Sequence, residues 1–149
     1  MVYKFKGKKF NEFKVGDGFT TASRTITEAD AVNFAGLSGD FNPLHTDEEF
    51  GKSTPFKGRI AHGMLSVAIA TGLANQLGIF EGTTIALLSM TINYKGAVKF
   101  GDTIHLELKV VEKKETSRDD RGIVTFDTIV YNQNKVSIVE GQWVLMLRK

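Results

Sequence analysis

Residues 38–66 read SGDFNPLHTDEEFGKSTPFKGRIAHGMLS, and the rest of the chain is best understood outward from this stretch. It holds both prolines of the chain and two of its three histidines. Asp40 lies five residues before His45, with the Asn42-Pro43 dipeptide between them. Because proline fixes its own φ angle and disfavours helix at the preceding residue, the dipeptide favours a tight turn. We expect this turn to hold Asp40 and His45 on one side of a loop.

The end of the stretch leads into a helix. Residues 64–77, MLSVAIATGLANQL, are apolar almost all round, which indicates a buried helix rather than an amphipathic surface helix. Gly63 stands where this helix should begin, so its backbone N–H would be free to face a bound group. Gly72 inside the helix costs about 1 kcal/mol relative to alanine, and close approach by a sheet or a partner chain would explain it.

Upstream of the stretch, the sequence predicts a strand over residues 19–26 and a helix over residues 28–37, capped by Thr27. Between residues 39 and 61 no regular period persists, although residues 46–49 have the form of a capping box for one short turn. A connection of this length inside a compact domain is usually functional.

Downstream, the sequence has the pattern of β-strands. Apolar and polar residues alternate over 104–110, which is typical of a half-buried strand. The strands expected here span residues 85–94, 104–110, 123–131 and 136–147. One long buried helix followed by antiparallel strands indicates an α+β fold, with the helix on one face of a sheet. The 149 residues contain no repeat or linker, so we expect a single domain over 1–149.

Composition excludes several classes of protein and site. The hydrophobic fraction of 42% and the charged fraction of 24% are ordinary for a globular domain, and a net charge of +2 is too small to indicate nucleic-acid binding. The absence of cysteine excludes disulfides, thiolate metal sites and a cysteine nucleophile. No apolar run approaches the roughly 20 residues that span a bilayer. The lysine-rich start, MVYKFKGKKF, lacks the apolar core of a secretory signal, so a cytoplasmic location is expected.

The central stretch resembles the motif of the MaoC-like, (R)-specific enoyl-CoA hydratase family. That pattern is an aromatic residue, a small residue, Gly, Asp, any residue, Asn-Pro-aliphatic-His, and later His-Gly-Met before a long helix. The residues that carry the resemblance are Phe34, Ser38, Gly39, Asp40, Phe41, Asn42, Pro43, Leu44, His45, His62, Gly63 and Met64. The match is close over residues 34–66, whereas the remainder matches in length and pattern only.

The resemblance implies both a fold and an activity. The fold would be a hot-dog fold, an antiparallel sheet wrapped around one long buried helix, pairing as a homodimer or a dimer-based higher oligomer. The activity would be (R)-specific hydration of trans-2-enoyl-CoA, reversible as dehydration. Its partner would be an acyl-CoA substrate, with no cofactor, metal, nucleic acid or membrane involved.

Hydration of an enoyl thioester requires three things of a site. Water must lose a proton as it attacks C3, C2 must gain a proton, and the negative charge on the thioester oxygen must be stabilised. By the resemblance, Asp40 and His45 hold the catalytic water, with Asp40 as base or water-orienting group and His45 as proton relay to C2. The sequence leaves that partition open. Gly63 N–H would hold the thioester oxygen, and a side chain at this position would obstruct the thioester.

Further residues are candidates for substrate binding. Asn42 would brace the loop rather than react. His62 would form a hydrogen bond with the loop backbone and fix the start of the helix. Small or medium side chains at Ser66 and Ile69 would line a pocket for a short or medium acyl chain. Basic side chains near this stretch have two interpretations, as contacts for the phosphates of the carrier or as solvated surface charges. These basic candidates are Lys57, Arg59, Lys95 and Lys99.

Two other functions stay open at this stage. A hot-dog acyl-CoA thioesterase would usually carry a carboxylate on its central helix, and residues 64–77 contain no Asp or Glu. A non-catalytic acyl-CoA-binding module would be expected to lack Asp40 or His45, and both are present. Asp40, His45 and His62 are ligand types for a metal, but no ligand spacing is fixed. Acyl chain length, carrier and physiological direction are not determined by the sequence.

Overall fold

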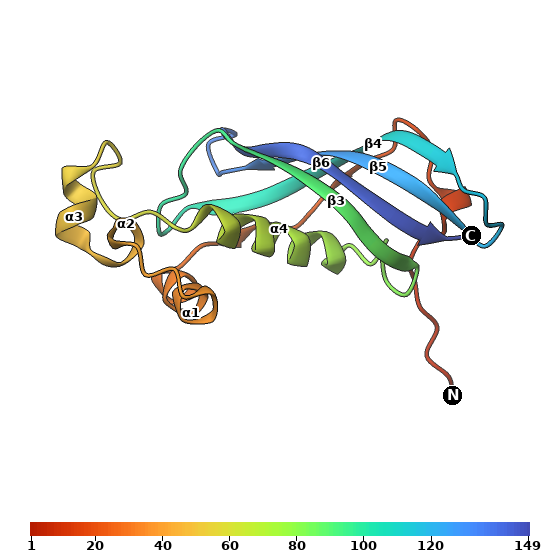
Figure 1. Ribbon diagram of the computed structural model, residues 1–149, viewed down its shortest axis with the longest axis horizontal. Coiled ribbons are helices and arrows are strands. Elements are labelled where there is room, and N and C mark those ends of the chain that lie inside the picture. The colour runs from red at the N-terminus through yellow and green to blue at the C-terminus, as the bar shows by residue number, and fades with distance from the viewer.

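The computed structural model describes residues 1–149, and its main feature is an antiparallel sheet curved over one helix (Figure 1). The strand order is β1-β4-β5-β6-β3, and the short strand β2 pairs separately with β4. The strands are β1 (Gly18–Thr20), β2 (Arg24–Thr25), β3 (Thr84–Tyr94), β4 (Thr103–Glu115), β5 (Arg121–Tyr131) and β6 (Ser137–Arg148). A 3-10 turn, η1 (Phe10–Glu12), precedes them. Strand β3 therefore forms one edge of the sheet.

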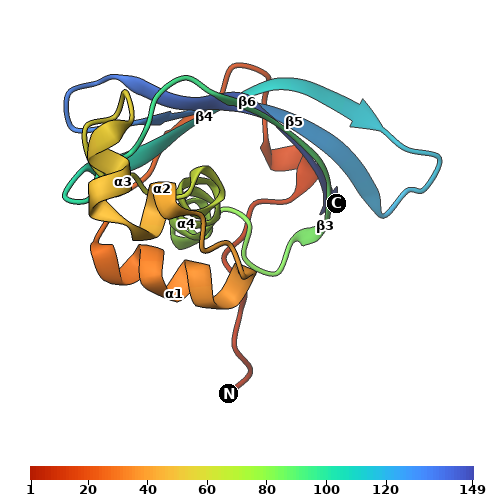
Figure 2. The same ribbon diagram turned by 60° about the vertical axis from the view of Figure 1, so that its left-hand side comes forward.

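Helix α4 (Gly63–Gln76) lies in the concave side of this sheet (Figure 2). Its buried residues are Leu65, Ser66, Val67, Ile69, Ala70, Leu73 and Ala74. The predicted hot-dog arrangement is thus confirmed. Burial on all sides is not found within the single chain, because Met64 and Ala68 are exposed. A Cβ built on Gly72 would meet nothing within 4 Å, so close approach by the sheet does not explain this glycine.

The core fills the space between α4 and the sheet. The inward residues of β4, among them Ile104, Leu106 and Val110, are fully buried as their alternation predicts. The predicted strand over 19–26 is instead two strands. Between them, Thr21 stays beside β4, where its hydroxyl oxygen accepts from Leu106 N–H at 2.9 Å. This side-chain hydrogen bond satisfies the Leu106 N–H, which a backbone carbonyl would accept from if the strand were continuous.

Helix α1 (Glu28–Ser38) begins at a reciprocal cap. The Thr27 side chain accepts from Asp30 N–H, and the Asp30 carboxylate accepts from Thr27 N–H. These hydrogen bonds, with the nearby Arg24 guanidinium, hold the pKa of Asp30 below its usual value. The helix ends at Gly39, whose left-handed φ of 77° suits glycine. Asp40 follows at once, so the end of α1 fixes where this carboxylate enters the loop.

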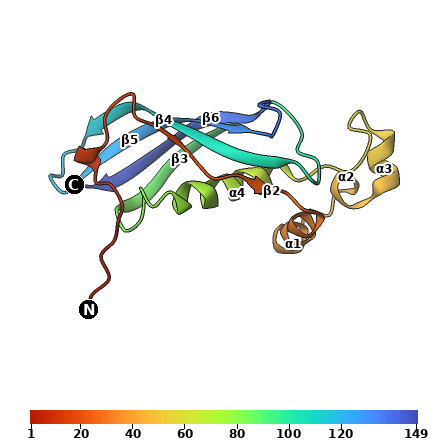
Figure 3. The ribbon, with the colours of Figure 1, turned by 180° about the vertical axis from the view of Figure 1, so that it is seen from behind.

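Two short helices, α2 (Pro43–Thr46) and α3 (Glu48–Ser53), occupy part of the region in which no regular pattern was expected. The predicted capping box at residues 46–49 is wrong, because Asp47 caps α3 by accepting from Phe50 N–H at 3.0 Å. The Thr46 hydroxyl instead donates to the backbone oxygens of Phe41 and Asn42, just before α2. Helices α1, α2 and α3 gather at one end of the molecule, away from both termini (Figure 3). No helix is long and apolar enough to cross a membrane.

Candidate active site

Three side chains meet where the loop after α1, helix α2 and the start of α4 come together. Asp40, His45 and His62 each place one nitrogen or oxygen atom within 4.8 Å of the others. Asp40 is exposed, His45 is half-buried and His62 is buried. The structure therefore brings the Asp40 carboxylate beside the His45 imidazole, as the spacing of the two residues predicts.

The loop that carries Asp40 is held by its own hydrogen bonds. Asn42 caps α2, its side-chain oxygen accepting from Leu44 N–H at 3.0 Å, and Pro43 occupies the first helical position. Asn42 N–H donates to Asp40 Oδ1 at 3.2 Å. Asn42 therefore braces the loop and orients the carboxylate. It is not among the residues that line the pocket beside His45.

His45 is oriented by a backbone carbonyl. Its Nδ1 lies 2.8 Å from the Ile60 oxygen. Because a carbonyl oxygen can only accept, Nδ1 is the protonated nitrogen in this bond. In the neutral ring, Nε2 is then free to accept a proton, which is the property required of a proton-transfer group.

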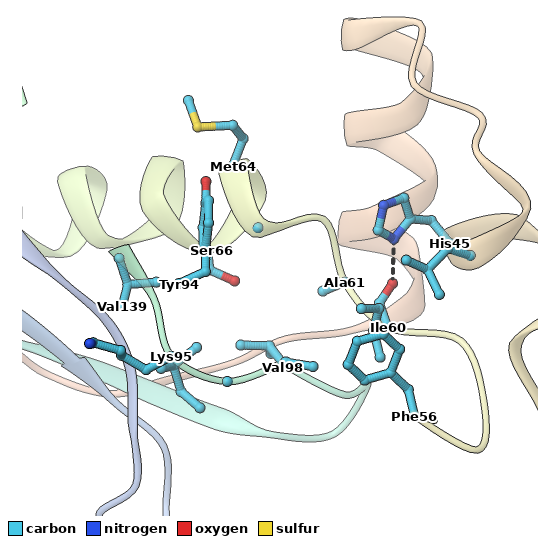
Figure 4. Close-up of a pocket in the computed structure, with 15 residues that line it drawn as sticks. His45, Phe56, Ile60, Ala61, Met64, Ser66, Tyr94, Lys95, Val98 and Val139 are labelled. Carbon is cyan, nitrogen blue, oxygen red and sulfur yellow. Dashed lines mark hydrogen bonds between the residues drawn. The ribbon is translucent and has the colours of Figure 1, made fainter. Parts of the chain in front are cut away.

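A pocket of about 480 Å³ opens beside His45 (Figure 4). Its volume lies in the range usual for small-molecule sites. Ten of its 15 lining residues are hydrophobic, which suits an acyl chain. The complete lining is Leu44, His45, Phe56, Ile60, Ala61, Gly63, Met64, Ser66, Tyr94, Lys95, Gly96, Ala97, Val98, Ile138 and Val139.

Gly63 begins α4 at the wall of this pocket, where the free N–H groups and the dipole of a helix terminus favour negative charge. The His62 side chain makes no capping bond at this terminus. A Cβ on Gly63 would lie 2.6 Å from Tyr94 Cε1. A side chain at this position would therefore meet the Tyr94 ring, an obstacle within the chain that the sequence did not indicate.

We expect Gly63→Ala to reduce the free energy of unfolding by about 1–3 kcal/mol, the usual cost of overpacking, because the new methyl displaces Tyr94. The check is a double-mutant cycle with Tyr94→Ala, measured by chemical denaturation. In the Tyr94→Ala background, the added methyl should cost much less. An equal cost in both backgrounds would show that Tyr94 is not what restricts position 63.

The remaining predicted binding residues divide between this pocket and other places. Ser66 lines the pocket, whereas Ile69 does not and lies instead beside a smaller hollow with Arg24 and Leu73. Position 69 is one helical turn beyond Ser66, and the pocket ends before reaching it. The pocket lining therefore includes Ser66 and does not include Ile69.

Arg59 is committed to ion pairs within the chain. Its Nη1 lies 2.7 Å from Glu28 Oε1, and its Nε lies 3.1 Å from Glu48 Oε2. The bonds to Glu28 and then Glu48 raise the pKa of Arg59. Arg59 thus ties α1 to α3, and these two ion pairs, rather than an open phosphate-binding side chain, are what the structure shows for it.

Among the other basic candidates, only Lys95 lines the pocket, and its Nζ lies 3.8 Å from Glu140. Lys57 is exposed in a loop with a φ of 60°, and Lys99 is exposed outside the pocket lining. The structure therefore favours Lys95 over Lys57, Arg59 and Lys99 as a charge close to a bound carrier.

Several pocket residues were missed from the sequence. Tyr94 comes from the end of β3, Phe56 from the loop after α3, and Val139 from β6. Burial raises the pKa of the Tyr94 hydroxyl. No local signal marks these residues, because only the folded sheet brings them to the start of α4.

Asp40, His45 and His62 are also the residues that could hold a metal ion. However, the His45 and His62 rings stack with their centroids 3.8 Å apart and their planes 30° apart. A metal binds an imidazole lone pair, which lies in the plane of the ring. One nitrogen of each ring already lies at a backbone carbonyl, so each histidine has a single nitrogen left as a potential ligand.

Comparison with known proteins adds independent information. The model of the family described as MaoC like domain matches residues 11–132. A relative named (R)-specific enoyl-CoA hydratase, from Rhodospirillum rubrum, is 36% identical over 93% of this chain and 90% of its own length. A solved R-hydratase from Pseudomonas aeruginosa superimposes with a TM-score of 0.78 at 34% identity, covering 95% of this chain and 86% of the other.

A third similar protein carries a different kind of name. The structure named as a monoamine oxidase regulatory protein, from Archaeoglobus, superimposes with a TM-score of 0.89 at 34% identity. The superposition covers 96% of this chain and 95% of that one. Proteins similar to this chain are thus named both as hydratases and as a regulatory protein.

Proposed function

The chain belongs to the MaoC-like domain family, and from this premise we propose that it hydrates trans-2-enoyl-CoA to (R)-3-hydroxyacyl-CoA and catalyses the reverse dehydration. Its relatives place it among the hydratase and dehydratase enzymes. The observation that carries the proposal is the approach of Asp40 to His45, within 4.8 Å, beside an apolar pocket that also includes Gly63.

In the proposed mechanism, water binds between the Asp40 carboxylate and His45 Nε2. Asp40 orients the water and draws off its proton as the oxygen forms a bond to C3. The electrons of the double bond move toward the thioester, whose oxygen becomes negative. The proton that Asp40 has taken passes to His45 Nε2, which delivers it to C2. Gly63 N–H, at the positive end of α4, stabilises the thioester oxygen. The product gains one hydroxyl and one hydrogen, which together are the water consumed.

The pocket supports a short or medium acyl chain. Its walls include Phe56, Val98 and Val139, and its volume is about 480 Å³. The apolar lining keeps bulk water away from the acyl chain, which strengthens electrostatic interactions at the reacting carbons. Lys95 in the lining is the basic group best placed to meet the charged part of a carrier.

The thioesterase alternative requires a carboxylate that this structure does not place on the central helix. Helix α4 carries no Asp or Glu, and the carboxylate beside the pocket belongs to the loop residue Asp40. A binding module without turnover is the other alternative. It is retained because the similar Archaeoglobus structure is named as a regulatory protein.

One experiment separates these three functions. The protein is incubated with crotonyl-CoA and, separately, with butyryl-CoA, while enoyl-thioester absorbance and free thiol are both recorded. We expect crotonyl-CoA absorbance to fall with no thiol release from either compound. Thiol release would identify a thioesterase, and saturable binding without either reaction would identify a binding module.

We also propose that the protein works as a cytoplasmic homodimer, paired through β3. This edge strand is 11 residues long and exposes Leu87 and Leu88 by 48% and 45%. A long apolar edge is prone to pair with another strand. Light scattering should give twice the chain mass of 16.4 kDa, and Leu88→Lys should return it to the monomer, unlike the control Val136→Lys. A monomeric wild type would contradict the proposal.

A further inference from the structure

His62 is almost fully enclosed, with only 2% of its surface exposed. Its Nε2 lies 2.9 Å from the backbone oxygen of Asp40. Because a carbonyl only accepts, Nε2 carries the proton, and in the neutral ring Nδ1 carries the lone pair. That Nδ1 is buried with no hydrogen-bond partner. An unpartnered buried nitrogen weakens the fold, so stability alone does not account for histidine here.

The ring of His62 contacts the second catalytic candidate as well. It stacks on His45 at a centroid separation of 3.8 Å, and it lies 5.0 Å from the ring of Phe34 on α1. The next residue in the chain is Gly63, the expected donor to the thioester oxygen. One buried side chain therefore joins the backbone of Asp40, the ring of His45 and the first turn of α4.

We infer that His62 is a positioning residue, which fixes Asp40 and His45 relative to each other and to the end of α4. This inference rests on the proposed hydratase function. It agrees with the expectation that His62 bonds the loop backbone, and it separates His62 from the other predicted substrate-binding residues, because His62 is buried and does not line the pocket. His62 acts on the reaction only through the two residues it holds.

If His62 is a positioning residue, a variant can lose kcat without losing stability. A purely structural residue would lose both together. In His62→Phe, an aromatic ring still packs on His45, and the unpartnered nitrogen is gone. The bond to the Asp40 carbonyl is lost, but Asp40 lies in an exposed loop, which can shift so that water reaches this carbonyl. In His62→Gln, the side-chain amide keeps an N–H donor near the position of Nε2, while the ring is lost.

We expect His62→Phe to melt at or above the wild-type temperature, yet to lower kcat for crotonyl-CoA by roughly 10–100-fold through misplacement of Asp40. Its KM should stay close to wild type, because the pocket lining is unchanged. His62→Gln should melt lower than His62→Phe but recover part of the lost kcat. Wild-type kcat in His62→Phe, or losses of kcat that simply follow melting temperature in both variants, would overturn the inference.

A crystal structure of His62→Phe provides a readout that does not depend on activity. The inference predicts a displaced Asp40 loop, with an altered separation between Asp40 and His45. Unchanged positions of both residues would overturn it. If wild type hydrates no enoyl-CoA, the proposed function fails by itself, and this structural comparison still decides whether His62 positions the pair.

Discussion

Replacing Asp40 by asparagine is expected to lower kcat for crotonyl-CoA hydration by about 10³-fold, within the range usual for a general acid or base. In the wild type, Asn42 N–H donates to Asp40 Oδ1 at 3.2 Å. Asparagine has nearly the same shape as aspartate and keeps an oxygen that can accept this hydrogen bond. It cannot take a proton from water. The loop should therefore persist while the proton transfer fails, and the melting temperature should change little. Initial rates and thermal denaturation are the measurements.

The matched control is Asp119→Asn, in the exposed turn between β4 and β5. It removes the same charge far from the pocket and should leave kcat unchanged. A near-wild-type rate in Asp40→Asn would show that this carboxylate does not take part in the chemistry. A large drop in melting temperature would instead show that Asp40 acts through the fold.

Replacing His45 by asparagine is expected to have an effect of similar size, about 10³-fold on kcat. The asparagine amide places an N–H near the position of Nδ1, so the 2.8 Å bond to the Ile60 carbonyl can be retained. The variant lacks Nε2, which the proposed mechanism uses to deliver a proton to C2.

His105→Asn is the control for this change. His105 lies on β4, stacked on Tyr131 and 3.7 Å from Glu107, and it takes no part in the pocket. Its loss should leave kcat near wild type. Because Asp40 and His45 act as a unit in the proposal, the double variant should be little slower than either single variant. If the two losses of kcat multiplied in the double variant, Asp40 and His45 would not act on a shared water molecule.

The sequence was informative wherever a local signal decides the structure. The apolar run predicted α4 to within a residue at each end. Its lack of a polar face predicted that the helix would be largely buried. The alternation over 104–110 predicted the buried face of β4. The Asn42-Pro43 turn predicted that Asp40 and His45 would meet, because both lie within a few residues of one rigid dipeptide.

The sequence was uninformative where distant segments decide the outcome. Tyr94 reaches Gly63 only because β3 ends beside the start of α4. Arg59 is taken up by Glu28 and Glu48, one on α1 and one on α3, and no local pattern shows that pairing. The double use of His62, on the Asp40 carbonyl and the His45 ring, likewise depends on three separate segments meeting.

The most direct test of the proposed activity is dehydration of the two enantiomers of 3-hydroxybutyryl-CoA, assayed separately by the appearance of enoyl-thioester absorbance. The proposal predicts that the (R)-enantiomer is dehydrated by wild type, and that Asp40→Asn and His45→Asn almost abolish the reaction. The (S)-enantiomer should remain unchanged. Turnover of the (S)-enantiomer, or of neither enantiomer, would contradict the assignment of this chain as an (R)-specific hydratase.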